Sequence, residues 1–290
     1  SESWAPLLRE AVSAGLVACA EGGGELLLLP ADDGLLLPLV PASREGDPPR
    51  RALALLPPRA GQRLRESGRL PSGVRTSSLG AAVGEPSFRA AVVEPFARGD
   101  PTPWSLVHAC RKRLAEARHL LAPGARVIPE GAVVLASLVE CRGAWLARQP
   151  LARVEGLDLS AASASLVPRS EGPLSCQMCE IAWRPLSAPV AALHLDLVAP
   201  GPWAGACDLV PTASGECHAV ALWVDFDLGG GRALSTGPPA PGAAPTGWSQ
   251  ALQLLPVPVP ATAGAAAVHL AVELSASFGL KLRVAQASDG

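Results

Sequence analysis

Charged residues are scarce in this sequence, and neither sign dominates. Only 17% of the 290 residues are Asp, Glu, Lys or Arg, and the formal net charge is −2. Basic residues are scattered apart from local groups such as Arg111-Lys112-Arg113. A strong positive field is what draws a protein to phosphate backbones. We therefore expect no nucleic-acid partner.

Long hydrophobic runs are also absent. The apolar runs at residues 26–29 and 35–37 are short and are bounded by prolines and aspartates, whereas a membrane-spanning helix needs about 20 apolar residues. We expect no membrane association. The hydrophobic content of 49% is nevertheless enough to bury a core. The sequence starts at Ser1 with neither an initiator Met nor a basic-then-apolar leader, which predicts a segment of a longer polypeptide.

A paired cysteine framework is the third thing missing. The seven cysteines are an odd number spread over the whole length, which favours a reducing, intracellular compartment, cytoplasmic or nuclear. Cys176 and Cys179 form a CxxC pair, and Cys207, Cys217 and His218 could complete four zinc ligands. That second group lacks the tight spacing of a zinc knuckle. Plain thiols and no metal site are the expectation.

Strand-like and helix-like segments alternate in the first half. Apolar residues recur with helical spacing at residues 3–17, 60–66 and 104–121, and buried strands are indicated at residues 25–29, 51–56 and 90–93, with another strand beginning at residue 127. In the third helix the arginines are expected to face outward. Such alternation predicts a parallel sheet.

The pattern changes after Glu130. Strand-like runs set off by proline and glycine clusters occupy residues 133–141, 193–198, 219–228, 251–257 and 268–274. The sequence therefore predicts an α/β domain over residues 1–129, followed by a β-barrel or sandwich over residues 130–290.

Three stretches, in this order, carry a resemblance to a known family. They are Val93-Glu94-Pro95-Phe96 with its following helix and residues 121–129, then Gly156-Leu157-Asp158-Leu159-Ser160, and finally Leu234-Ser235-Thr236-Gly237 with residues 246–251. Together they resemble the protein arginine methyltransferase family. The likeness is greatest to the second half of a member built from two tandem modules. It implies a Rossmann-like methyltransferase domain, here degenerate, joined to a β-barrel.

Active members hold S-adenosylmethionine on a glycine-rich turn after the first strand, because only glycines let backbone N–H groups approach the ligand closely. Here that turn reads LPADDG over residues 29–34, so Asp32, Asp33 and Gly34 form a degenerate turn with one glycine left. The second strand should end in a carboxylate for the ribose hydroxyls, but the sequence has Leu56-Pro57. We expect no cofactor bound to this chain, although the full enzyme would use S-adenosylmethionine.

The resemblance also implies two glutamates that hold the substrate guanidinium. Glu94 aligns with the first, but Pro103 stands where the second belongs, so Glu94 is interpreted as a vestigial catalytic residue with a structural or solvated role. The family's Thr-His-Trp turn is reduced to Thr246 and Trp248 around Gly247. A dimerisation-arm-like insertion is expected near residues 153–175, with Leu157 and Leu159 at its interface.

The predicted function is that of a C-terminal, non-catalytic module of an arginine methyltransferase. It would serve as a pseudo-dimer scaffold for an active, monomethylating module of the same polypeptide or for a second copy, with arginine-containing proteins as substrates. Two alternatives stay open at this stage. One is a divergent but active arginine methyltransferase, which bound cofactor would reveal, and the other is a stand-alone adaptor with a dead methyltransferase fold.

Overall fold

The computed structural model describes most of the chain, with gaps in both halves. The described residues are 6, 9–15, 25–31, 37–40, 52–56, 58–68, 70, 74–78, 86–95, 102–149, 153–160, 163, 172–198, 201–239, 248–275, 277 and 279–286. Asp32, Asp33, Gly34 and Thr246 lie outside these ranges. What the sequence predicts for these four residues therefore stays a prediction.

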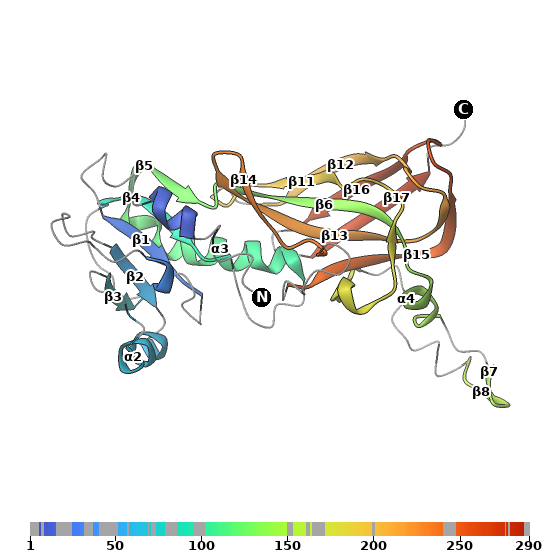
Figure 1. Cartoon of the computed structure of the whole chain (residues 1–290), viewed down its shortest axis with the longest axis horizontal. Helices are drawn as coiled ribbons and strands as arrows, with labels where there is room; N and C mark the ends of the chain where they lie inside the picture. Colours follow the sequence, from blue (N-terminus) through green and yellow to red (C-terminus); the bar gives the residue numbers. More distant parts are fainter. Residues whose placement is uncertain are drawn as a thin grey trace.

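A five-stranded parallel sheet forms the first part of the molecule (Figure 1). Its strands lie in the order β3-β2-β1-β4-β5, and every neighbouring pair is parallel. Their bounds are β1 (Leu26–Leu29), β2 (Ala52–Leu56), β3 (Val74–Ser78), β4 (Phe88–Val93) and β5 (Leu121–Ile128). Apolar residues fill β1 and β2 and, apart from the exposed Arg89, β4, because helices or loops cover both faces of a parallel sheet. The predicted α/β sheet is confirmed.

Helices pack against this sheet. Residues 9–15 are helical, α2 spans Pro58–Glu66, and α3 spans Pro103–Ala117 with a 3-10 turn at Arg118–Leu120. Trp104, Val107, Cys110, Leu114 and Ala117 form the buried face of α3, with the spacing of three or four residues that one helix face requires. Figure 1 shows α3 running from the parallel sheet toward the β-rich part. Within the described ranges, no helix has the length and apolar character to cross a membrane.

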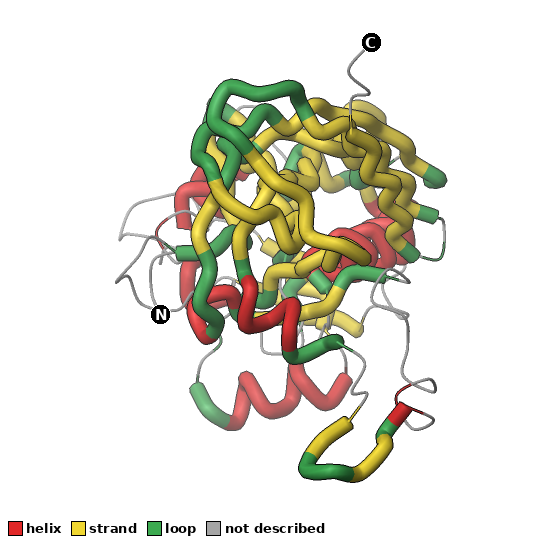
Figure 2. The backbone as a smooth tube through the Cα atoms, turned by 90° about the vertical axis from the view of Figure 1, so that its right-hand side faces the viewer, coloured by secondary structure: helices red, strands yellow, loops and turns green. Residues whose placement is uncertain are grey.

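Antiparallel strands build the second part, and Figure 2 shows them curling around its core. One sheet has the order β10-β6-β13-β15-β9, with β11 on β6 and β14 on β13, and a second has the order β12-β16-β17. The bounds are β6 (Gly131–Glu140), β9 (Leu174–Cys176), β10 (Arg184–Pro185), β11 (Val190–Leu195), β12 (Trp203–Leu209), β13 (Gly215–Gly229), β14 (Arg232–Ser235), β15 (Gln250–Ala261), β16 (Val268–Leu274) and β17 (Leu280–Gln286). The predicted β-barrel-like region is confirmed.

Both faces of the long strand β13 are covered. Val220, Leu222 and Val224 belong to the main core. Ala221 and Trp223 point to the other face, because side chains alternate along a strand, and join a second cluster that includes Met178. That cluster lies under α4 (Arg142–Leu146) and the 3-10 turn Met178–Glu180. The β-rich part therefore carries two hydrophobic layers.

A small hairpin stands away from the body of the molecule (Figure 1). It consists of β7 (Arg153–Val154) and β8 (Leu157–Asp158), joined by Glu155 and Gly156. Both turn residues have positive φ, 47° and 87°, which is the geometry of the two-residue turns that connect tight hairpins. Leu157 is 68% exposed. The hairpin therefore presents an apolar side chain to the surroundings.

Several local predictions were wrong. The third helix ends at Ala117 and not at residue 121, which is already the first residue of β5. Residues 127 and 128 end that strand and do not begin one. Strands β3, β12 and β17 were missed, because their polar and small residues lack the dense apolar runs on which the prediction relied.

Candidate functional site at the ends of β1 and β4

The strand order reverses between β1 and β4. From β1 the sheet continues to β2 and β3 on one side, and β4 and β5 lie on the other. In open α/β sheets such a switch point leaves a crevice at the carboxyl ends of the two strands, where ligands bind. Pro30 and Ala31 follow β1, and Glu94 and Pro95 follow β4. These residues therefore define the candidate site.

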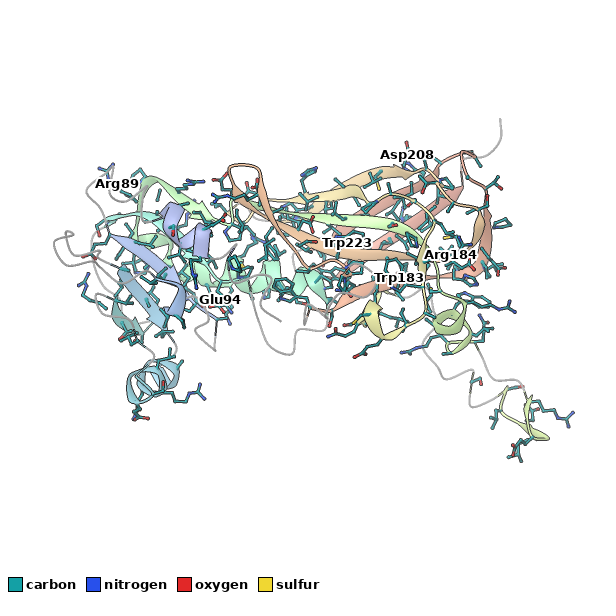
Figure 3. The ribbon with its side chains drawn as sticks, in the orientation of Figure 1. Arg89, Glu94, Trp183, Arg184, Asp208 and Trp223 are labelled. Atoms are coloured by element: carbon teal, nitrogen blue, oxygen red, sulfur yellow. The ribbon has the colours of Figure 1, made fainter. Side chains whose placement is uncertain are left out.

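The carboxylate of Glu94 lies in this candidate site. The side chain is fully buried, and Oε2 accepts a hydrogen bond of 3.1 Å from the backbone N–H of Ala31. The backbone N–H of Glu94 also donates to the carbonyl oxygen of Leu29 at 3.0 Å, which extends the β1–β4 ladder. Figure 3 places Glu94 beside the parallel sheet, on the side toward the β-rich part. The carboxylate therefore binds the turn after β1 and is withheld from solvent.

Helix α3 fixes the backbone of the same residue. Arg113 Nη1 donates to the Glu94 carbonyl oxygen at 2.7 Å, and the Cys110 Sγ lies 3.7 Å from that oxygen as a weaker donor. Burial raises the pKa of the Cys110 thiol to about 12, against the opposing effect of Arg113. The thiol is therefore protonated at neutral pH and is no nucleophile. Arg113 faces inward, which corrects the expectation that the arginines of this helix face outward.

The other positions expected to bind ligand carry apolar residues. Leu55 and Leu56 at the end of β2 are 2% and 1% exposed, so this strand end offers no carboxylate to a ribose. Pro103 is the buried first residue of α3, where its missing N–H costs nothing. Pro103 therefore acts as a helix-starting residue, and Glu94 has no second glutamate at this position.

The barrel motif places two polar side chains in the core. Gln250 Nε2 donates to the carbonyl oxygens of Thr236 at 2.7 Å and Trp248 at 2.9 Å, and Gln250 Oε1 accepts from the Met178 N–H at 3.0 Å. The Thr236 hydroxyl in turn bonds the backbone of Val224. Trp248 packs in the main core. Thr236 and Gln250 lie in the stretches that carry the family resemblance, but nothing in those stretches indicates that the two side chains join three strands and the 3-10 turn.

Cysteines give no support for a metal site. Among the described residues, no three His, Cys, Asp or Glu side chains group closely enough to hold a metal ion. Cys207 lies on β12, whereas Cys217 and His218 lie on β13 of the other sheet. Burial raises the pKa of both Cys176 and Cys217 to about 11. His218 is buried against Trp145, with their ring centroids 5.9 Å apart.

Known proteins resemble this chain both in sequence and in fold. No family model matches the chain. Protein arginine N-methyltransferase 7 of Mus musculus is 30% identical over 154 residues, and that of Rattus norvegicus is 31% identical over 154 residues. The counterpart in Danio rerio is 29% identical over 157 residues. These matches cover 50% of this chain and 22% of each relative.

A solved structure matches far more of the fold. It is described as a Trypanosoma brucei PRMT1 enzyme-prozyme heterotetrameric complex with AdoHcy, and it superposes with a TM-score of 0.70 at 15% identity over 98% of this chain and 90% of that one. The predicted resemblance to the protein arginine methyltransferase family is confirmed. Protein arginine N-methyltransferase 7 is the family member to which the sequence motifs pointed. The region that matches this chain makes up less than a quarter of the length of that relative.

S-adenosylmethionine, the cofactor that an arginine methyltransferase fold implies, does not fit the described residues at this site. The Ala31 amide, which an open turn would offer to a ligand, is bonded to Glu94. Pro30, the residue before it, has no N–H to donate. At the end of β2, Leu56 is buried where a carboxylate would be required. A polar ligand placed here would lose its hydration, and Pro30, Ala31 and Leu56 would offer it no replacement hydrogen bond.

Proposed function

We propose that this chain is a non-catalytic module of a protein arginine methyltransferase, and that it acts as a pseudo-dimer scaffold for an active module. The observation that carries the proposal is the buried hydrogen bond between Glu94 and Ala31. A glutamate that serves a guanidinium must present both oxygens to the substrate. Here one of these oxygens accepts from the chain's own backbone, and the side chain is fully buried.

Two further observations support the scaffold role. The similar solved structure is named as an assembly of an enzyme with a prozyme, which favours pairing between unlike copies of this fold. The β7–β8 hairpin exposes 68% of Leu157, and an isolated two-stranded hairpin is marginally stable in water. We infer that this arm, with Leu157 and Leu159, packs on a partner module.

The proposed partner is an active module in the same polypeptide or a second chain of this fold. That module would bind S-adenosylmethionine and monomethylate arginine in protein substrates. We further propose a domain boundary near Pro129, which lies between the last parallel strand and the first antiparallel one. The odd cysteine count and the six described free thiols favour an intracellular location.

Methyl transfer to arginine peptides tests the proposal. The active module would be assayed alone, with this chain, and with this chain carrying Glu94→Gln. We expect this chain to raise the activity of its partner, and Glu94→Gln to lower the rate by less than about tenfold, a barrier change of roughly 1.4 kcal/mol. The equivalent glutamate change in the active module is the matched control and should abolish turnover.

The opposite pattern would reject the proposal. If the chain alone methylates peptides, or if Glu94→Gln is as damaging as the control change, Glu94 takes part in chemistry and the chain is a divergent enzyme. If the active module neither binds this chain nor responds to it, the scaffold role is wrong.

A further inference from the structure

An apolar groove lies outside the candidate site, where the two parts of the molecule meet. Its volume is about 370 Å³, within the roughly 300–1,000 Å³ typical of small-molecule sites. Leu114 and Ala115 of α3 form one wall, β5 contributes residues 121–125 and Val127, and Leu197 and Val198 after β11 close the far side. Figure 1 shows β5 running to this junction. The groove therefore joins the α/β part to the β-rich part.

The strand that lines the groove is poorly suited to bind a peptide by strand addition. β5 is the last strand of its sheet, but its pairing with β4 jumps from Phe88–Leu121 to Ala90–Arg126. Residues 122–125 therefore bulge out of the ladder, with Pro123 lacking an N–H and Gly124 at a φ of 74°. Proline and bulges are the features that prevent edge-to-edge pairing. A compact ligand fits this surface better than an extended chain.

The charged groups in the lining are of one sign. Of the described residues that line the groove, Arg111 and Arg118 are charged and none is acidic. The Arg111 guanidinium lies 4.5 Å from the centre of the Trp203 ring, a cation–π contact that fixes its position. Burial lowers the pKa of Arg111, and Asp196 opposes this shift. The positive charge of Arg111 is therefore partly balanced by the negative charge of Asp196.

Arg118 is the more available cation. It follows the last residue of α3, is exposed, and makes no ion pair with any described carboxylate. Beside it, Leu121 and Val127 are half-buried and Val198 is 46% exposed. An apolar body lying on these side chains would place an anionic head within reach of a guanidinium, the side chain that pairs best with carboxylates.

We propose that this groove binds a small amphipathic anion, a carboxylate with an apolar tail. The occupant covers the exposed apolar side chains and pairs its head group with Arg118. Because the lining comes from both parts of the molecule, binding also holds the two parts in one relative arrangement. The inference does not depend on the proposed function, since none of its residues belongs to the site at β1 and β4.

Calorimetry on the full chain with decanoate is the test. Acetate supplies the head group alone, and decyltrimethylammonium supplies the same tail with the opposite charge. We expect decanoate to bind at one site and the other two compounds to bind at least about tenfold more weakly. Equal binding of the cationic compound, or no binding of decanoate at about millimolar concentration, overturns the proposal.

Three variants locate the binding on the groove. Arg118→Glu should weaken decanoate binding by more than about tenfold. Lys112→Glu makes the same charge change at an exposed position of α3 outside the groove, and it should change the affinity for decanoate by less than about twofold. Ala115→Trp, also at an exposed position, should fill the groove and abolish binding while Arg118 is retained. Thermal unfolding confirms that each variant folds. Decanoate binding unchanged by Arg118→Glu and Ala115→Trp, or self-association of the chain that Ala115→Trp abolishes, would assign the groove another role.

Discussion

The Glu94 carboxylate accepts a hydrogen bond from the Ala31 N–H across the switch point of the parallel sheet, at 3.1 Å. The carboxylate joins the end of β4 to the turn after β1, and Arg113 holds the carbonyl oxygen of the same residue. Residues at this point of an α/β sheet usually receive a ligand. In this chain Glu94 and Ala31 hydrogen-bond to each other, and both residues are buried in the core.

Replacing Glu94 should therefore destabilise the fold. Glu94→Ala leaves the buried Ala31 N–H without its acceptor and opens a cavity, and we expect a loss of about 2–4 kcal/mol in the free energy of unfolding. Glu94→Gln keeps an acceptor oxygen and should lose less. Urea unfolding of the three proteins measures both effects. Equal or greater stability for Glu94→Ala would show that the carboxylate has no structural role.

Gln250 should be the polar residue on which the barrel core depends most. Gln250→Leu removes the partner of two carbonyl oxygens and one N–H, and we expect it to cost about 2–4 kcal/mol. Gln253→Leu on the same strand is the matched control, because in the described part of the chain the Gln253 side chain makes one hydrogen bond, of 3.3 Å, to the carbonyl oxygen of Leu254. Similar melting temperatures for the two variants would contradict this view of Gln250.

We expect the β7–β8 hairpin to be a site of association with the partner module. Leu157→Asp should weaken binding to the partner module by about tenfold or more, because a buried charge without a partner is costly. Glu155→Gln, in the adjoining turn, is the control and should have little effect. Sedimentation of the mixed modules gives the answer. If Leu157→Asp leaves the affinity between the modules unchanged, the interface lies elsewhere.

The exposed cysteine thiol should react faster than the buried ones. Thiolate is the reactive form, and burial raises the pKa of Cys110 and Cys141 to about 12. Cys179 is exposed. In a Cys19→Ser background, mass spectrometry after brief alkylation at about pH 8 should find the label on Cys179 first. Fast labelling of Cys110 in the folded protein would mean that the candidate site is open to solvent.

The sequence predicted the layers of the fold better than the contacts of the site. The leucines of β1 and the apolar face of α3 carry a strong local signal, because burial on a sheet or helix face sets their spacing. Strand β3 has a weak signal, since Thr76, Ser77 and Ser78 are polar and only partly buried. The pairing of β3 with β2, not its own residues, determines that it is a strand.

Site contacts depend on residues distant in the sequence. Nothing near Arg113 indicates that its guanidinium meets the Glu94 carbonyl oxygen. Arg111 likewise meets Trp203, the first residue of β12, which is far from it in the sequence. The absence of a second glutamate at Pro103 and of a carboxylate after β2 could be read directly from the sequence. That Glu94 is buried and bonded to Ala31 could not, because this contact joins residues 63 positions apart.

Calorimetric titration of the folded chain with S-adenosylmethionine tests the central claim most directly, together with thermal unfolding at millimolar cofactor. A ligand at about a hundred times its dissociation constant adds roughly 2.7 kcal/mol of stability, which raises the melting temperature by a few degrees for a protein of this size. Because Glu94 occupies the Ala31 amide and Leu56 stands at the ribose position, we expect no binding heat and no shift in melting temperature. Micromolar binding of the cofactor or its demethylated product would contradict the non-catalytic assignment and make this chain a divergent arginine methyltransferase.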